Sequence, residues 1–156
     1  MSTEQILHPE KYPDDVPSLA ALPANLADQL GGGWREVDRN VWGELDLTLL
    51  LAEQLPYEAE AGAAGWDGSE YVFLTNGDKR LFVMELAWDN VAEAKEGHNV
   101  FTHWLAKRGF SADGEVRYQT TALSAALQLQ GDRLFVCLGD DTAAVSEVAG
   151  IWKRQP

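Results

Sequence analysis

Three histidines are the side chains of this sequence best suited to bind a transition metal: His8, His98 and His103. His98 and His103 lie five residues apart in a stretch with helical periodicity, which places them on different faces of a helix. A zinc site needs several converging ligands, such as Cys pairs or a His-Glu-x-x-His sequence, and the chain contains neither. We therefore expect no metal site and no cofactor.

Nucleophilic catalysis requires a serine or cysteine with a base within reach. Ser124 and Ser146 have no neighbouring histidine, and Cys137 lies within an apolar run, where a thiol is buried and inert. Glu44 and Asp46 could act as a carboxylate pair, but acids at the start of a helix are already favoured by the helix dipole. The sequence thus predicts no catalytic residue and no enzymatic activity for this chain.

Two predicted loops, residues 67–70 and 139–141, contain clustered oxygen atoms that could bind calcium weakly. Neither matches the ligand spacing of an EF-hand loop. A turn at Asp67-Gly68 and a helix cap at Asp141 explain the same residues without an ion. The structural explanation is the better one.

Six tryptophans remain as candidates for a binding surface. Three fall within or at the ends of periodic elements and are expected in the core: Trp88, Trp104 and Trp152. The others flank predicted loops and, with one acidic neighbour, are the candidate binding residues: Trp34, Trp42, Trp66 and Asp67. If the three tryptophans lie close together in the fold, they would form a hydrophobic groove for a peptide or a covering domain. The preferred alternative is that they seal the N-terminal segment onto a sheet.

The elements that must position these residues centre on a hairpin. Glu70–Thr75 and Arg80–Trp88 flank Asn76-Gly77, a strong turn signal because both residues tolerate positive φ. The return strand is apolar at nearly every position, which predicts an interior place in the sheet. Three further strands are expected, the last two as a second hairpin, at Glu115–Thr120, Ala125–Gln130 and Arg133–Gly139. The segment 34–42 fits a short strand or an irregular edge.

Apolar residues at helical spacing predict three main helices: Leu45–Leu55, one beginning at Asp89-Asn90 and ending near Gly109, and Ala143–Lys153. Shorter ones are expected within Ser18–Leu30 and at Tyr57–Ala64. The fold class is therefore α+β, with a mostly antiparallel twisted sheet of about five strands and helices packed on it. We expect a Pro-rich N-terminal segment, residues 1–30, that packs on a single domain, residues 31–156.

The chain is strongly acidic. Its 156 residues carry a formal net charge of −13, and residues 1–89 contain 17 acidic but only 5 basic side chains. Such a surface repels nucleic acid and anionic lipid, so we expect neither as a partner. No apolar run is long enough for a membrane span and no signal peptide is recognisable, so we expect no membrane insertion. The single cysteine excludes an internal disulfide.

Several strings of residues resemble a known family: Ser2–Tyr12 (STEQILHPEKY), Gly33-Trp34, Gly43-Glu44, Ala63–Gly68 (AAGWDG) and Trp88-Asp89. Together they are similar to the C-terminal half of a largely uncharacterised family of bacterial proteins, often predicted to be exported. In those proteins the preceding half resembles a zinc metallopeptidase with an HExxH helix. That helix is absent here, so the resemblance implies an accessory domain and transfers no metal ligand or catalytic residue.

Two hypotheses about the function follow. In the first, the chain is a non-catalytic accessory or interaction domain whose partner is a peptidase-like domain or another protein. In the second, it is a stand-alone binding protein for a small apolar ligand or a peptide, held in a pocket between sheet and helices. Localisation and oligomeric state do not follow from these residues.

Overall fold

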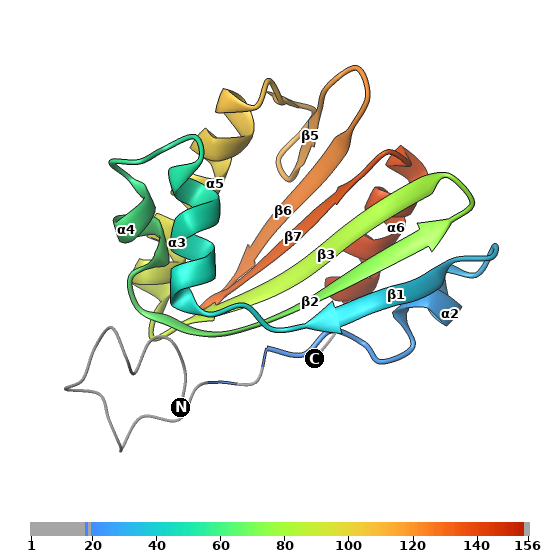
Figure 1. Ribbon diagram of the computed structural model, residues 1–156, viewed down its shortest axis with the longest axis horizontal. Coiled ribbons are helices and arrows are strands. Elements are labelled where there is room, and N and C mark those ends of the chain that lie inside the picture. Colours follow the sequence, from blue (N-terminus) through green and yellow to red (C-terminus); the bar gives the residue numbers. More distant parts are fainter. Residues whose placement is uncertain (1–17, 19, 155–156) are drawn as a thin grey trace.

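The computed structural model describes Ser18 and residues 20–154, which form one open sheet with helices on both sides (Figure 1). The helices are α2 (Leu26–Leu30), α3 (Glu44–Ala52), α4 (Ala59–Ala63), α5 (Val91–Lys107) and α6 (Thr142–Trp152). The strands are β1 (Arg35–Asn40), β2 (Trp66–Asn76), β3 (Lys79–Trp88), β4 (Ser111–Ala112), β5 (Arg117–Gln119), β6 (Ser124–Gln130) and β7 (Arg133–Gly139).

The sheet is antiparallel throughout, with the order β1-β2-β3-β7-β6-β5-β4. The expected α+β class is confirmed, but the expectation of about five strands is wrong, since the sheet has seven. The strand that the sequence did not indicate is β4, an edge strand whose two residues are too few to show apolar alternation. Strand β1, at the opposite edge, corresponds to the short strand or irregular edge expected over residues 34–42, and it is almost wholly polar.

The two faces of the sheet are covered by different helices. We call the side with α3, α4 and α5 the front face, and the side with α2 and α6 the back face. In Figure 1 the front helices stand at one end of the strands and α6 lies behind them. Each face has its own apolar core because successive residues of a strand point to opposite sides. Thus Met84 and Leu86 belong to the front core, and Leu81 and Val83 to the back core.

The predicted hairpin forms between β2 and β3, with Gly77 at φ +61° in its turn. Strand β3 pairs with β2 on one side and β7 on the other, so its predicted interior position is confirmed. Strand β2 begins at Trp66, earlier than the predicted Glu70. The additional residues pair with the end of β3 through a register shift between Trp66 and Gly68.

Side-chain caps mark the starts of the two longest helices. The Asn90 side chain accepts hydrogen bonds from the backbone N–H groups of Ala92 and Glu93, at 2.9 and 3.1 Å. Asp141 caps α6 in the same way. Helix α3 is shorter than predicted and ends at Ala52. The chain then turns before Pro56 and forms only the short α4 in place of the predicted helix over residues 57–64.

A charged side chain lies inside the back core. Glu85 is 4% exposed, and its two oxygens accept hydrogen bonds from Arg133 Nη1 at 2.9 Å and Trp152 Nε1 at 3.1 Å. Burial of a carboxylate is tolerated when its oxygens are paired in this way. The contact joins α6 to β3 and β7.

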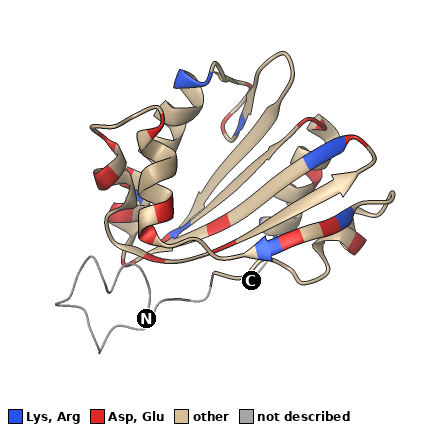
Figure 2. Ribbon diagram, viewed as in Figure 1, with Lys and Arg blue, Asp and Glu red and all other residues tan. Residues whose placement is uncertain are grey.

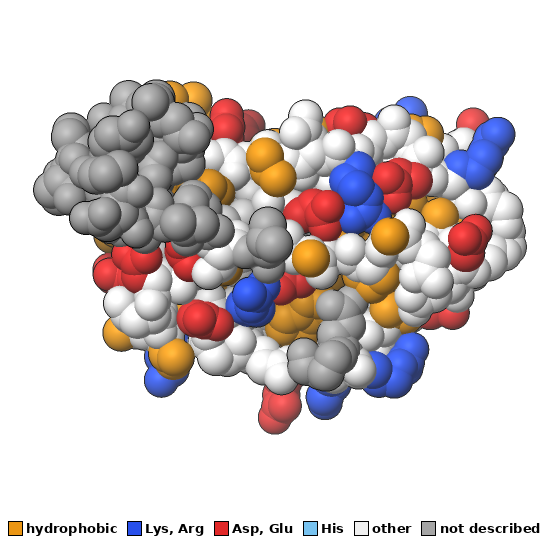
Figure 3. Space-filling view, turned by 90° about the horizontal axis from the view of Figure 1, so that it is seen from below, with side chains coloured by type: hydrophobic (Ala, Val, Ile, Leu, Met, Phe, Trp, Pro, Cys, Tyr) orange, Lys and Arg blue, Asp and Glu red, His pale blue; other side chains and the backbone are white. Residues whose placement is uncertain are grey.

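The edge strand β1 carries acidic and basic side chains in close succession, as the view from below shows (Figure 3). Arg39 pairs with Glu36 and Glu70 at 3.0 and 2.9 Å. The β1–β2 pairing shifts register between Glu36 and Asp38. Charge and irregularity both discourage another strand from adding to this edge.

Part of the predicted N-terminal segment, residues 1–17 and 19, lies outside the described residues. In the described part, the backbone N–H of Ser18 donates to Asp67 and that of Leu22 donates to Glu70. Helix α2 then buries Leu26 and Leu30 against the back core. The division into a segment 1–30 and a domain 31–156 stays a prediction. Within the described part of the chain, no helix combines the length and the apolar character needed to cross a membrane.

Candidate functional site

The front face contains a cavity of about 200 Å³ where α3 and α5 leave part of the sheet uncovered. All of its lining side chains are apolar or aromatic. They come from the loop after β1, from α3 and α5, and from β3 and β7: Trp42, Leu50, Phe82, Met84, Phe101, Trp104, Val136 and Leu138. We call this the front cavity.

The floor of the front cavity is set by strand register. Phe82 of β3 lies opposite Leu138 of β7, and Met84 lies opposite Val136. Because strand side chains alternate between faces, these four residues point to the same side of the sheet. Met84 and Val136 are buried, whereas Phe82 and Leu138 are half-buried at the open end of the cavity.

One wall is aromatic. The ring of Trp42 lies 5.7 Å from the rings of both Tyr71 and Phe82, and Tyr71 stacks on Phe82 at 5.5 Å. The Tyr71 hydroxyl donates to Asp38 at 2.6 Å, and this hydrogen bond raises the pKa of Tyr71. The same hydrogen bond helps to hold the Tyr71 ring beside Trp42.

The backbone of Trp42 is held by one buried serine. Its N–H donates to Ser69 Oγ at 2.9 Å, and the Ser69 hydroxyl donates back to the Trp42 carbonyl at 2.8 Å. Ser69 is 5% exposed, so both bonds are shielded from water. The loop between β1 and α3 thereby places Trp42 over the sheet.

The helical wall is held by Trp104. Its indole N–H donates to the carbonyl of Leu50 at 3.0 Å, which links α5 to α3. Arg108 lies over the same ring, 4.7 Å from its centroid, and pairs with Glu53 at 3.0 Å. Both walls of the front cavity are thus positioned by hydrogen bonds of their own lining residues, Trp42 to Ser69 and Trp104 to Leu50.

The structure does not bring the four sequence-predicted binding residues together. Trp42 lines the front cavity. Trp34 packs on the back core, on the other side of the sheet. Trp66 is 4% exposed within β2, and Asp67 accepts a hydrogen bond from Ser18. Trp66 does flank a loop, since it is the first residue of β2 after the turn at Ala64-Gly65, and its pairing with Trp88 helps to bury it.

The remaining lining residues were not predicted as a site. Leu50, Phe82, Phe101 and Leu138 have the apolar spacing of core positions, and in the sequence they cannot be distinguished from fully covered ones. Trp104 was predicted in the core and is 5% exposed, yet it also borders the front cavity. The sequence contains no signal for the uncovered part of the sheet.

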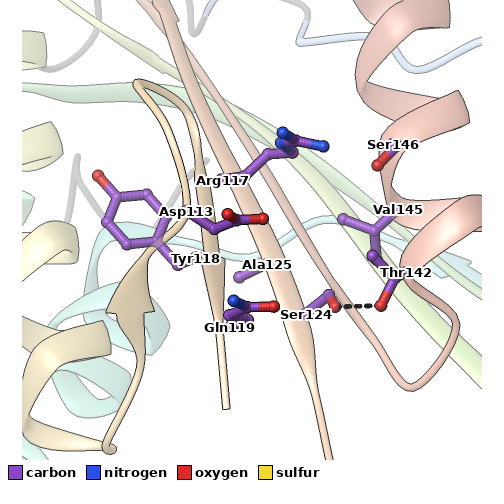
Figure 4. Close-up of a pocket in the computed structure, with 9 residues that line it drawn as sticks. All are labelled: Asp113, Arg117, Tyr118, Gln119, Ser124, Ala125, Thr142, Val145 and Ser146. Carbon is purple, nitrogen blue, oxygen red and sulfur yellow. Dashed lines mark hydrogen bonds between the residues drawn. The ribbon is translucent and has the colours of Figure 1, made fainter. Parts of the chain in front are cut away.

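A second, polar pocket lies between β5, β6 and α6 (Figure 4). Its volume is about 10 Å³, which is close to the minimum that holds one water molecule. Ser124 and Thr142 share a hydrogen bond of 2.7 Å there, and Ser146 lies further along α6. Ser124 is therefore engaged in joining β6 to α6.

The other candidates for chemistry line neither the front cavity nor the small pocket at Ser124. Cys137 is buried in β7, and burial raises the pKa of its thiol. His103 contacts Glu58 at 2.9 Å on the surface. Asp46 accepts a hydrogen bond from the Gly43 N–H at the start of α3. In the described part of the chain, no three His, Cys, Asp or Glu side chains are grouped so that they could hold a metal ion.

Comparisons with known proteins give a family and a fold. The family model described as "Domain of unknown function (DUF8575)" matches residues 28–149. No curated protein matches the sequence. The crystal structure of the extracellular domain of PknH from Mycobacterium tuberculosis is similar, with a TM-score of 0.50 and 7% identity. The similarity covers 89% of this chain and 98% of that one. At that identity the match shows a shared fold alone.

Proposed function

This chain belongs to the DUF8575 family, a domain of unknown function, and we propose that it is a binding domain that takes an uncharged apolar group into the front cavity. The observation that carries the proposal is the cavity lining, which consists of eight apolar side chains. Concave apolar sites of this kind are the usual places for ligands. In a fully packed core the helices would have covered these side chains.

The size and lining of the front cavity suit a compact group. An apolar cavity of roughly 150 Å³ accepts benzene, so about 200 Å³ accommodates one aromatic ring or a branched aliphatic side chain. The rings of Trp42 and Phe82 offer aromatic contacts, and the Met84 sulfur is favourable beside an aromatic ring. No lining side chain can form an ion pair, so an anionic group such as a carboxylate would lose its hydration without compensation.

The direct test is titration with toluene, an uncharged probe of this size. Binding is followed by methyl chemical shifts of Leu50, Met84 and Leu138, with Leu26 on the back face as an internal reference. We expect saturable shifts at the front methyls and a Kd of about 1 mM or lower, equivalent to roughly 4 kcal/mol. Unchanged front methyls up to the solubility limit of toluene would refute the proposal.

A cavity-filling variant separates the front cavity from other sites. Leu138→Trp places a larger ring at the half-buried mouth, and we expect it to weaken toluene binding at least about tenfold. Val91→Trp is the matched control, because Val91 is exposed in the first turn of α5, about three helical turns before the lining residue Phe101. Trp42→Ala removes one wall and is the second test if Leu138→Trp fails to fold. If the folded variants bind toluene as tightly as the control does, toluene does not bind in the front cavity.

The alternative of an accessory domain beside a metallopeptidase-like domain stays a prediction. It rests on the resemblance of the sequence strings, and neither the family description nor the similar structure names a peptidase. The front cavity is compatible with either kind of occupant, a free molecule or a side chain of another protein.

A further inference from the structure

Helix α3 has apolar side chains on all sides. Leu47 and Leu51 are buried in the front core and Leu50 lines the front cavity, but Leu45 and Leu49 point outward and are 45% and 62% exposed. A helix at a protein surface normally presents polar residues to solvent. One turn apart, Leu45 and Leu49 lie on the same side of the helix. We call the exposed apolar surface formed by Leu45 and Leu49 the strip.

The strip lies in an acidic region. Between residues 41 and 64 there are five acidic side chains and no basic one. Glu44 is buried, and the other four reach the surface: Asp46, Glu53, Glu58 and Glu60. Figure 2 shows these acidic positions along α3 and α4, whereas the middle of the sheet carries few charges. Arg108 and His103 of α5 contact Glu53 and Glu58, which leaves the region with a net negative charge.

Leu50, which lines the front cavity, follows Leu49 in the chain and lies about 100° further around α3, so the strip and the front cavity open on neighbouring sides of this helix. We propose that the physiological occupant of the front cavity is an apolar side chain of a basic peptide segment from a partner protein, whose neighbouring apolar residues lie on Leu45 and Leu49. This inference rests on the proposed function of the front cavity. A peptide bound as a helix or as an extended segment, with one residue anchored in the front cavity, would cover the front cavity and the strip at the same time.

Charge complementarity selects this occupant. Lysine and arginine residues flanking the anchor would face the acidic side chains of α3 and α4, which favours association and raises its rate. A second copy of this chain would bring two acidic surfaces together, and an acidic peptide would be repelled in the same way. A free hydrocarbon would fill the front cavity but leave Leu45 and Leu49 in contact with water.

The test uses two synthetic peptides with the same apolar anchors, one flanked by lysines and one by glutamates, measured by calorimetry. We expect the lysine peptide to bind at least about tenfold more tightly at low ionic strength, with the difference shrinking as salt is added. Toluene should compete with the lysine peptide, because both occupy the front cavity. Equal affinity for the two peptides would overturn the inference.

A double variant, Leu45→Gln with Leu49→Gln, tests the strip itself. Both positions are exposed and glutamine is a good helix former, so the fold is retained. We expect at least an approximately tenfold loss of lysine-peptide affinity while toluene binding is unchanged. Val91→Gln, at an exposed apolar residue in the first turn of α5, is the matched control.

The outcomes separate the two proposals. Toluene binding without a lysine-peptide preference overturns the peptide inference and leaves the front cavity as a small-ligand site. Absence of both kinds of binding refutes the proposed function as well. A dimer in sedimentation experiments that the double variant abolishes would overturn the inference, since the strip would then bind a second copy.

Discussion

The indole nitrogen of Trp104 donates a hydrogen bond of 3.0 Å to the carbonyl oxygen of Leu50 and thereby joins α5 to the last turn of α3. Carbonyls in the last turn of a helix have no partner within the helix, so this bond satisfies one of them. Leu50 and Trp104 also line the front cavity. The hydrogen bond that satisfies the Leu50 carbonyl at the end of α3 therefore also positions the helical wall of the front cavity.

Trp104→Phe tests this contact. Phenylalanine keeps an aromatic ring but removes the N–H donor, and we expect the free energy of unfolding to fall by about 2 kcal/mol, measured by urea denaturation. The control is Tyr57→Phe, which removes a polar group from a fully exposed ring and should change stability little. Equal effects of the two substitutions would show that the Leu50 contact contributes nothing.

Gly97→Ala tests the packing of α5 on the sheet. A Cβ atom at Gly97 would lie 2.4 Å from Cζ2 of Trp88, a fully buried ring. Overpacking should lower the free energy of unfolding by about 1–3 kcal/mol, despite the better helix propensity of alanine. The matched control is Gly150→Ala in α6, where the nearest atom lies at 3.7 Å on the flexible Arg154 side chain. That change should raise stability by about 0.5–1 kcal/mol, and a loss there would contradict the steric argument.

Asp141 should make stability depend on pH. The hydrogen bond from Lys79, followed by those from backbone N–H groups including Ala144, lowers the pKa of Asp141. Because the folded pKa is lower than the unfolded one, the contribution is fully present above the unfolded value of about 3.9. It is lost as the pH falls through the folded pKa.

Asp141→Asn measures this contribution, because it removes the charge and keeps a capping side chain. The variant should be less stable than the wild type near neutral pH by about 0.5–1 kcal/mol, and this difference should shrink in acid. Denaturation curves across the acid range provide the measurement. Asp78→Asn, at an exposed position in the β2–β3 turn, serves as the control. A difference that is constant with pH would exclude the charge as its cause.

Cys137 should be unreactive in the folded protein. It is fully buried in β7, and burial raises the pKa of its thiol, which disfavours the reactive thiolate. We expect a thiol reagent to label it only after denaturant unfolds the chain, with the labelled fraction following the unfolding curve. Rapid labelling in native buffer would mean that β7 opens locally.

Local sequence determined most of the elements. Gly77 set the β2–β3 turn because glycine accepts the positive φ observed there, although the two turn residues are Gly77 and Asp78, and Asn76 still pairs with Lys79. Asn90 and Asp141 set the starts of α5 and α6 through bonds to neighbouring N–H groups. The apolar run of β3 predicted an interior strand correctly. In each case the residues responsible are close together in the chain.

Only the tertiary structure decided the candidate site. Trp42 meets Phe82, and Leu50 meets Trp104, across 40 and 54 residues of sequence. Such pairs depend on strand order, on register and on how far α3 and α5 extend over the front face. The sequence pattern of Trp34, Trp42 and Trp66 could not show that they lie on the back face, at the front cavity and in the front core at the start of β2. Alternation in a strand defines two faces, but the helices that fold back onto them determine which apolar residues remain uncovered.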